Sequence, residues 1–426
     1  MSDNAAPTPR KNPVFTIFLT VFLDLLGLTI IIPVLAPLLV DSLEVFGPEV
    51  ELQTRTLTLG AVIGTFALMQ FFSAPFLGAL SDKYGRRKVL FYSLYASLLG
   101  YILFGLGIIW GSLEIMFLGR IVGGLGSGNI SVIYSSIADV SSAAEKARNF
   151  GIVGMAFGLG FVIGPVLGGF LADPEIVSWF SSSTPFFFSA LLVALNIVLV
   201  YFRFPETNLH PNRELQPNLG GAMRNLVKAF GHPQLRSIFL VIFFFTFGFA
   251  FFTQFFQVFL IGKFEYDESD IGLLFGYIGV LIALTQGLLV RALSKRVGPM
   301  KLVLFCLPLL VLAFIVLVFP DTSLGLYLVM PGVAVAQGLT SPNLYAIVSN
   351  SVPEDQQGET LGMQQSMQSL GQLVPPLIGG YAVAQVLTMP IWLAAGTVFL
   401  GWVIFVWQFG KKALKEGPPQ DVEAGE

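Results

Sequence analysis

The chain consists largely of long apolar stretches separated by short polar turns. Each stretch approaches or exceeds the roughly 20 mostly apolar residues that a helix needs to cross a bilayer, and about twelve such stretches follow one another. The predicted spans are residues 14–40, 56–81, 88–110, 113–138, 147–172, 184–203, 236–262, 270–294, 300–319, 324–349, 358–387 and 390–409. This pattern predicts an all-α membrane protein.

Composition agrees with this pattern. Hydrophobic residues make up 54% of the 426 residues and charged residues only 12%, whereas about a quarter of the residues in soluble domains are charged. The N-terminal sequence MSDNAAPTPRKNP has no small-residue cleavage site after a short apolar core. We therefore predict that the first apolar run is a retained helix and not a signal peptide.

Positive charge is distributed unevenly between the two sides of the predicted spans. Of 23 Lys and Arg residues, 20 fall on the side of the N-terminus, Arg55 and Lys263 fall on the other side, and Arg120 lies within a span. Loops of the other side, such as DSLEVFGPEVE and EYDESD, are acidic. The positive-inside rule then places both termini of this multi-pass protein in the cytoplasm, and we expect a cell (inner) membrane location.

Cysteine and histidine are too scarce for a metal or disulfide site. Cys306 is the only cysteine and lies within an apolar span, while His210 and His232 both fall in the central polar loop. We therefore expect no metal, no other cofactor and no disulfide framework.

An internal repeat divides the chain into two halves. The segments GALSDKYGRRKVL (78–90) and RALSKRVGPMKLV (291–303) match at an offset of 213 residues. The Gly and Pro residues of 160–169 match those of 371–380 at an offset of 211. Such repeats predict two six-helix bundles related by a pseudo-twofold axis along the membrane normal, with a substrate site between them near the midplane.

The longest polar interval gives the domain boundaries. Residues 204–234 separate the sixth span from the seventh. We predict an N-terminal bundle over 1–203, a cytoplasmic linker over 204–235, a C-terminal bundle over 236–411 and a cytoplasmic tail over 412–426.

A glycine- and charge-rich motif forms the short turn between the second and third spans. Its members are Gly78, Asp82, Gly85, Arg86 and Arg87. Glycine is needed where a tight turn crowds the backbone or requires positive φ. Asp82 can accept hydrogen bonds from Arg86 or from a helix N-terminus in the other bundle, which would latch the cytoplasmic face shut. For Arg87 and Lys88, a simple stop-transfer charge cluster explains the sequence equally well.

A second motif lies in the fifth span. Its members are Gly151, Gly160, Gly164, Pro165, Gly168 and Gly169. Glycines on one helix face allow a neighbouring helix to approach closely, and Gly-Pro introduces a bend. The helix can therefore act as a gate, although the same residues would also serve packing alone.

These motifs resemble those of a known family. The turn motif resembles the signature of the major facilitator superfamily, and LGRIVGGLGSGN, with Arg120, is similar to that family's arginine motif. The fifth-span pattern resembles the antiporter motif of the drug:proton branch, and FLDLLGLTIIIPVLAPLL, with Asp24, is similar to tetracycline/proton exporters. The similarity is close over 14–207 and loose beyond. It implies a proton-coupled antiporter that exports a small amphiphilic or hydrophobic compound by alternating access, as in multidrug efflux and antibiotic resistance.

Some positions depart from that resemblance. Where close tetracycline exporters carry a buried carboxylate in the third span, this chain has Gly100, and residues 300–319 contain no acidic residue where those exporters have one. Their eighth-span histidine is replaced by Ile282, although Gln286 keeps a polar position nearby. Metal-chelated tetracycline is therefore a poor fit as substrate.

Asp24 is the acidic residue at midplane depth. It lies ten residues after Val14, about 15 Å into a core of about 30 Å. A carboxylate at that depth is costly and by default marks an ion or proton pathway. Arg120 could approach Asp24, either to modulate a proton-carrying carboxylate or to form a static ion pair that only fixes packing.

Polar and aromatic residues within the spans are candidates for the substrate cavity. They are Asn129, Tyr134, Gln254, Gln257, Tyr277, Gln286, Gln337, Asn343, Gln365, Gln368 and Gln372. For any one of them an ordinary interhelical hydrogen bond is the alternative. The Phe-rich seventh span could add an apolar wall, although most of its rings are expected to face lipid or other helices.

Two alternatives to drug export remain open. One is an exporter or flippase of an amphiphilic lipid or metabolite, and the other is a non-transporting membrane receptor on the same fold. An enzyme is not expected, because the spans hold no His cluster, no paired carboxylates and no phosphate-binding Gly-Lys-Ser/Thr loop. The expected partners are a small-molecule substrate, protons and the lipid bilayer, with no nucleic acid, and the chain is expected to be a monomer.

Overall fold

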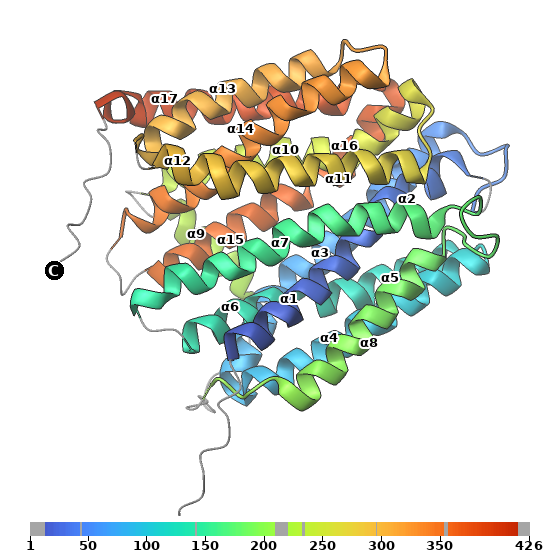
Figure 1. Cartoon of the computed structure of the whole chain (residues 1–426), viewed down its shortest axis with the longest axis horizontal. Helices are drawn as coiled ribbons and strands as arrows, with labels where there is room; N and C mark the ends of the chain where they lie inside the picture. The colour runs from blue at the N-terminus through green and yellow to red at the C-terminus, as the bar shows by residue number, and fades with distance from the viewer. Residues whose placement is uncertain are drawn as a thin grey trace, which may run out of the picture.

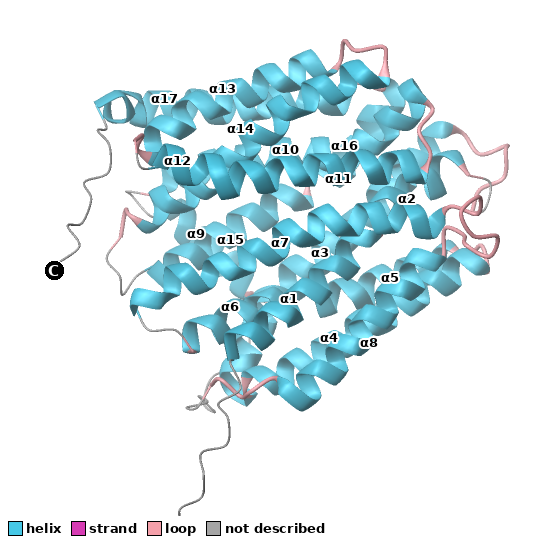
Figure 2. Ribbon diagram, viewed as in Figure 1, coloured by secondary structure: helices cyan, strands magenta, loops and turns pink. Residues whose placement is uncertain are grey.

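Helices form almost all of the part of the chain that the structure describes. The structure, a computed structural model, describes residues 13–42, 45–140, 143–208, 220–231, 235–294, 296–352 and 357–415. Within these ranges the chain contains no strand, and the loops gather at the two ends of the helices (Figure 2). The predicted all-α class is confirmed, while His210 and His232 lie outside the described residues.

In chain order the helices are α1 (Pro13–Ile30), α2 (Ile32–Ala36), the π-helix η1 (Pro37–Asp41), α3 (Leu52–Tyr84), α4 (Arg86–Ile109), α5 (Leu113–Gly126), the 3-10 turn η2 (Ser127–Asn129), α6 (Ile130–Asp139), α7 (Ala143–Ala172), α8 (Thr184–Arg203), α9 (Gly221–Gly231), α10 (Arg236–Phe264), α11 (Glu268–Leu284), the π-helix η3 (Thr285–Val290), α12 (Arg291–Ser294), α13 (Pro299–Leu317), α14 (Ser323–Ser349), α15 (Gln357–Leu373), α16 (Pro375–Gln385) and α17 (Met389–Lys415).

The predicted spans map onto these helices. Ten helical runs of the described chain are long and apolar enough to cross a bilayer. The two remaining predictions correspond to α7, with a shorter apolar stretch at 158–172, and to the pair α15–α16. That pair is interrupted at Val374, because the prolines that follow cannot continue the backbone hydrogen bonding. The last helix continues to Lys415, so the first residues of the predicted tail are helical.

The two halves of the chain form two adjacent bundles (Figure 1). In the N-terminal half, α4 packs against both α5 and α8, and in the C-terminal half α13 packs against α14 and α17. The start of α1 and the end of α17 lie at the same end of the molecule. The predicted linker contains the helix α9, which the polar composition of that segment did not suggest.

The two ends of the bundles differ in charge. The end that holds the α3–α4 turn is here named the basic end, and it carries Lys83, Arg86, Arg87, Lys88, Arg203, Lys411, Lys412 and Lys415. The opposite end is named the acidic end, and it carries Glu49, Glu51, Asp173, Glu175, Glu265, Asp267, Glu268, Asp270 and Asp321. Arg55 and Lys263 are at the acidic end, as the sequence predicted.

Glycines join the two bundles near the acidic end in two equivalent contacts. A Cβ on Gly169 of α7 would lie 2.5 Å from the Glu268 carbonyl oxygen of α11, and a Cβ on Gly380 of α16 would lie 2.5 Å from the Thr56 carbonyl oxygen of α3. Gly169 and Gly380 are 211 residues apart, and Thr56 and Glu268 are 212 apart. The repeat seen in the sequence therefore reappears as the same contact made twice.

A second layer of this interface repeats the relation. A Cβ on Gly272 of α11 would lie 2.5 Å from the Pro165 carbonyl oxygen of α7. Its equivalent, Gly60 of α3, faces the Pro376 carbonyl oxygen of α16 even more closely. A pseudo-twofold that exchanges α3 with α11 and α7 with α16 accounts for both layers, which supports the predicted arrangement of two related bundles.

The contact between α7 and α11 is limited to one part of their length. Ser269 at the start of α11 donates a hydrogen bond of 2.9 Å to Asp173, just after α7. Toward the basic end, Gly158 of α7 and Gly287 of η3 have no atom within 4 Å of a built Cβ. Between these points Gly279 of α11 still meets the Phe161 carbonyl oxygen of α7, 2.8 Å from a built Cβ. Beyond it, toward the basic end, α7 and α12 lie apart (Figure 1).

This interface predicts the effect of one added methyl group. In Gly169→Ala the new Cβ meets backbone atoms of Glu268 and Ser269 at 2.5 and 3.0 Å, and backbone cannot rotate away as a side chain can. We expect α11 to move away from α7, so the acidic ends of the two bundles separate.

Double electron–electron resonance measures the distance between two nitroxide labels. The labels are attached at Glu175→Cys and Ser323→Cys in a Cys306→Ala background, one on each bundle at the acidic end. Gly158→Ala is the matched control in the same helix, since its Cβ meets no atom within 4 Å and it should gain at most about 1 kcal/mol of helix stability. A label distance in Gly169→Ala equal to that of the control would contradict the contact.

Candidate functional site

The turn motif forms a charge cluster at the basic end. Arg86 is 7% exposed, and its Nη1 lies 2.5 Å from Asp82 Oδ1. Its Nε donates to Asp139 Oδ2 at 3.0 Å, and its Nη1 donates to Ser81 Oγ at 2.7 Å. Since Arg86 belongs to α4 and its partners to α3 and α6, one guanidinium ties the basic ends of three helices together.

A carboxylate from a distant segment completes the turn. Glu206, after α8, accepts hydrogen bonds from the backbone N–H groups of Arg86 at 2.8 Å and Arg87 at 3.2 Å. A carboxylate there satisfies free donors at the start of α4 and complements the helix dipole. Gly85 has a φ of 98°, where glycine is favoured, and a Cβ on it would lie 2.5 Å from Glu206 Oε2. The predicted need for glycine in this turn is therefore met at Gly85.

The sequence suggested that Asp82 latches onto a helix of the other bundle, and the structure shows other partners for it. The side chain of Asp82 pairs with Arg86, and the Asp82 carbonyl accepts from Asn208 at 3.0 Å. Within the described residues, the groups that bond to this cluster all precede α9 and so lie on the side of the N-terminal half. The charge cluster thus stiffens that half at its basic end and does not join the two bundles in this arrangement.

The glycines of the fifth-span motif face two different helices. Gly160, Gly164 and Gly168 face α1, and a Cβ on Gly164 or Gly168 would overlap its atoms. Thr29 of α1 donates a hydrogen bond of 2.8 Å to the Gly160 carbonyl. Gly169 faces α11 of the other bundle instead.

Helix α7 consequently packs on its own bundle and on the other one. Pro165 lies inside α7 and its carbonyl faces Gly272, so the motif residue itself takes part in the interface. Gly151 belongs to α7 as well, but the packing around it lies outside what the structure describes. Close packing, which both interpretations of the motif require, is present.

Asp24 lies in the middle of α1 and is partly buried. The Asn129 amide interacts with its carboxylate, and Tyr101 of α4 lies within electrostatic range of it. Neither polar atom of the Asn129 amide has a hydrogen-bond partner of standard geometry among the described residues. No ion pair joins Asp24 to Arg120 in that part of the chain, so the static pair considered from the sequence is not formed.

Arg120 is held among aromatic rings. Its guanidinium carbon lies 4.1 Å from the ring centre of Phe104 and 5.7 Å from those of Phe66 and Phe186. The residue is 5% exposed, and its Nε and Nη2 have no hydrogen-bond partner among the described residues. Cation–π attraction replaces part of the lost hydration, and Tyr101 lies within electrostatic range of both Arg120 and Asp24.

Gly100 has no room for a side chain. A Cβ there would lie 2.5 Å from the Gly123 Cα and 2.9 Å from the Gly119 carbonyl oxygen. Helices α4 and α5 are therefore in direct backbone contact at this position, which leaves no space for the carboxylate that the resemblance implied. Glycine at this position is a packing requirement of this chain.

Polar candidates from the two halves meet between α6 and α14. Tyr134 of α6 interacts electrostatically with Tyr345 of α14, and the Tyr345 hydroxyl donates to Gln368 Oε1 at 2.7 Å. Tyr345 was not among the predicted cavity residues, because a single tyrosine in an apolar span gives no signal of its own. The pair thus brings groups of the two bundles within electrostatic range of each other.

Several glutamine side chains of the C-terminal half have buried amide atoms without a hydrogen-bond partner among the described residues. The Oε1 atoms of Gln254, Gln257 and Gln337 are buried and have no hydrogen-bond partner among the described residues. Gln364 of α15, which was not predicted, is fully buried with both amide atoms in the same condition. Unsatisfied buried amides are costly unless a ligand or water meets them.

The other candidates fall into two groups. Tyr277 of α11 donates a hydrogen bond of 3.3 Å to the Tyr327 carbonyl of α14. Asn343 donates one of 2.7 Å to the Leu339 carbonyl of its own helix. Both bonds are ordinary hydrogen bonds between or within helices. Gln286 and Gln372 are exposed and Gln365 is partly buried.

The phenylalanines of α10 are packing residues for the most part. The fully buried rings include Phe239, Phe251, Phe252, Phe255, Phe256 and Phe259. Phe252 contacts Phe314 of α13 with ring centres 5.1 Å apart. These rings face neighbouring helices, as expected for most of the rings of this span.

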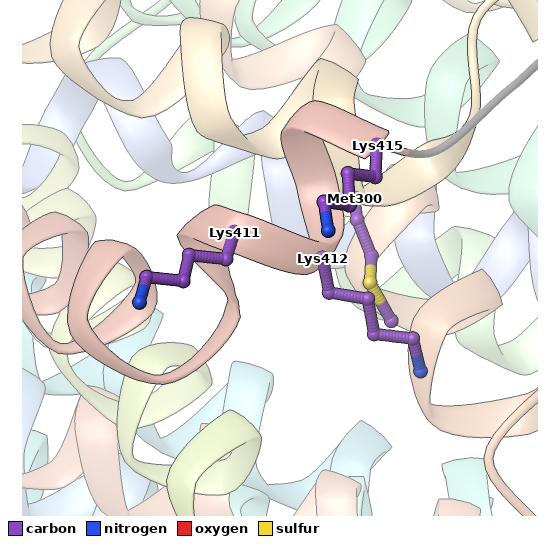
Figure 3. A pocket seen from close by; sticks show the side chains of 4 residues that line it. All are labelled: Met300, Lys411, Lys412 and Lys415. Atoms are coloured by element: carbon purple, nitrogen blue, oxygen red, sulfur yellow. The ribbon is translucent and has the colours of Figure 1, made fainter.

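One cavity of about 460 Å³ lies at the basic end, lined by Met300, Lys411, Lys412 and Lys415 (Figure 3). Its residues come from the ends of α13 and α17 and include none of the predicted cavity residues. Three lysines at a helix end agree with the positive charge of the basic end. The cavity is therefore separate from the predicted substrate cavity between the two bundles.

Comparison with known proteins agrees with these features. The family model described as Major Facilitator Superfamily matches residues 17–376. The class C tetracycline resistance protein of Escherichia coli is 30% identical, with 86% of this chain and 89% of that protein covered. Multidrug resistance protein 1 of Bacillus subtilis is 28% identical, with 92% and 95% covered. The solved structure of the human organic anion transporter MFSD10 superposes with a TM-score of 0.70 at 24% identity, covering 93% and 100%.

The charge cluster predicts a contrast between two neighbouring cations. Arg86→Met removes the partner of Asp82 and Asp139 and leaves two carboxylates close together. We expect it to lower the free energy of unfolding by about 2–4 kcal/mol, since breaking a largely buried pair is costly. Exposed Lys88→Met should cost under about 1 kcal/mol.

Thermal melting of the purified protein in detergent measures both variants. Equal melting temperatures for Arg86→Met and Lys88→Met would show that the cluster does not hold the helix ends together.

Proposed function

The chain belongs to the major facilitator superfamily and is a multi-pass membrane transporter rather than an enzyme, and from this premise we propose a proton-coupled antiporter. It exports a small amphiphilic or hydrophobic compound by alternating access, as in multidrug-type efflux. The observation that carries the proposal is Asp24, a partly buried carboxylate in a membrane helix that no cation neutralises in the described part of the chain.

The orientation follows from charge. The basic end faces the cytoplasm and the acidic end faces outward, because Lys and Arg are retained on the cytoplasmic side. Both termini are then cytoplasmic, and the membrane is the cell (inner) membrane. The chain acts as a monomer, since each half finds its partner within the same chain.

Proton exchange at Asp24 follows from its surroundings. A charged carboxylate is disfavoured in an apolar medium and favoured when water or a cation approaches, so a change of access changes its protonation. Arg120 acts through Tyr101 and not by direct pairing, which leaves the carboxylate available for a proton. Asp24 is the proton carrier and Arg120 its modulator.

The direction of access follows from the interface. Because the bundles are joined at the acidic end and diverge along α7 and α11 toward the basic end, this arrangement gives access from the cytoplasm. Asp24 releases its proton to cytoplasmic water as substrate enters. Opening at the acidic end then releases substrate outward and reprotonates Asp24, and the Asp82–Arg86 cluster keeps the helix ends of the N-terminal half rigid during the exchange.

The substrate site is formed by Asn129 and Tyr134 on one side and by the amides of the other half. Unpartnered oxygens and nitrogens at Gln254, Gln257 and Gln364 suit a ligand with several hydrogen-bonding groups on an apolar body. The relatives are tetracycline, multidrug and organic anion transporters by name. The backbone contact at Gly100 argues against metal-chelated tetracycline in particular.

Two other functions remain as alternatives. An exporter or flippase of an amphiphilic lipid or metabolite would use the same amides, and competition between lipids and drugs for binding to the purified protein separates it from drug export. A receptor without transport has no use for an unneutralised Asp24, and the first experiment below separates it.

Replacing the proposed proton carrier tests coupling. We expect Asp24→Asn to keep its fold but to lose exchange driven by an imposed pH gradient in proteoliposomes. The substrate is the first compound from a chemically diverse library that drives proton flux with the wild type. Asp41→Asn, an exposed carboxylate at the end of η1, is the control and should keep wild-type flux; full coupling in Asp24→Asn would refute the assignment.

Replacing one amide tests the substrate site. Gln364→Leu removes buried groups that lack partners, so the melting temperature should stay the same or rise. If substrate meets this amide, KM should rise about 3–10-fold, the value of one hydrogen bond. Exposed Gln53→Leu is the control. A lower melting temperature with unchanged KM would make Gln364 a structural residue only.

A further inference from the structure

Helix α9 has two distinct exposed faces. Met223, Val227 and Phe230 are 53%, 67% and 44% exposed, and their spacing of four and three residues places them on one stripe. Arg224 and Lys228 are also exposed, each one residue further and thus about 100° around the helix. An apolar stripe beside a basic stripe is typical of a helix that lies in a membrane interface.

The position of α9 is fixed by the bundles on which it rests. Its first residue, Gly221, lies beside Pro75 of α3, with a built Cβ 3.3 Å from that ring. The helix also packs on α15 of the other half, and Figure 1 places it beside α15 toward the end that holds the C-terminus. Four residues connect it to Arg236 at the start of α10, which allows about 14 Å at most.

The depth of α9 follows from the length of α3. That helix has 33 residues, about 50 Å, and exceeds a hydrocarbon core of about 30 Å by about 10 Å at each end. Pro75 is nine residues before the end of α3 at Tyr84, about 14 Å along the axis. Gly221 is therefore about 4 Å inside the boundary between headgroups and hydrocarbon at the basic end, close to the depth of an interfacial helix.

We propose that α9 is an interfacial helix that binds anionic phospholipid of the leaflet at the basic end. The stripe of Met223, Val227 and Phe230 enters the acyl region, and Arg224 and Lys228 contact headgroup phosphates. Charge complementarity selects this occupant, because juxtamembrane basic residues attract anionic lipids. The lysines at the end of α17 (Figure 3) also lie at the basic end but belong to another helix that does not pack on α9 in the described chain.

The contact has a consequence for the two bundles. Since α9 touches α3 of one half and α15 of the other, lipid that holds α9 also restrains the basic ends of both halves. Anionic lipid therefore acts where α3 and α15 of the two halves lie beside α9.

The experiment measures the depth of α9 directly. With Cys306→Ala as background, a single nitroxide is attached at Val227→Cys or at Arg224→Cys. The full-length protein is placed in vesicles of phosphatidylcholine alone or with about one third phosphatidylglycerol. Accessibility to oxygen and to a water-soluble nickel chelate gives the depth of each label.

We expect the label at 227 to be accessible to oxygen and protected from nickel, and the label at 224 to be accessible to nickel. Phosphatidylglycerol should move label 227 deeper, and the double change Arg224→Gln with Lys228→Gln should abolish that movement. The same change at Lys412 and Lys415 is the control and should leave the movement intact.

Two results would overturn the proposal. A label at 227 as accessible to nickel as the label at 224 would place α9 in water. A label at 227 that is immobile and protected from both reagents would show that protein covers the stripe. The measurement needs no transport, so it stands whether or not the proposed antiport holds.

Discussion

The cost of an unneutralised charge inside an apolar helix bundle governs this structure. Asp24 and Arg120 are ionisable residues within the spans, yet in the described chain they form no ion pair. Phe66, Phe104 and Phe186 hold the guanidinium, and Asn129 and Tyr101 approach the carboxylate. A direct pair would neutralise both charges permanently. Keeping them apart leaves a carboxylate whose charge must respond to whatever water, proton or ligand reaches it.

The second constraint is the closeness of the two bundles at the acidic end. Gly169 and Gly380 allow backbone-to-backbone contact in two places that the pseudo-twofold relates. Such contacts contain no long side chains, so they can part and reform as rigid units. Together with the divergence of α7 and η3 toward the basic end, they fit the proposed mechanism, in which Asp24 is reached from one side at a time.

The sequence predicted what is local or periodic, and it missed what distant segments bring together. Apolar runs gave the spans, and the Asp82–Arg86 pair follows from a spacing of four residues on adjoining helices. Glu206 and Asp139 complete that cluster from segments more than 50 residues away, so no local pattern contains them. Gln364 and Tyr345 were not predicted as cavity residues for the same reason. Their burial and their partners depend on how the two halves pack, which no local pattern shows. Of the two forms that an Asp24–Arg120 approach could take, the direct ion pair is absent from the described chain, where three aromatic rings surround the guanidinium.

The most direct test of the account is whether substrate binding displaces a proton from Asp24. Purified protein in weakly buffered detergent, with a soluble pH indicator, is mixed with saturating substrate and the released protons are counted per substrate bound. The account predicts release from the wild type and none from Asp24→Asn, with binding retained in both. Equal release from the two proteins would contradict it.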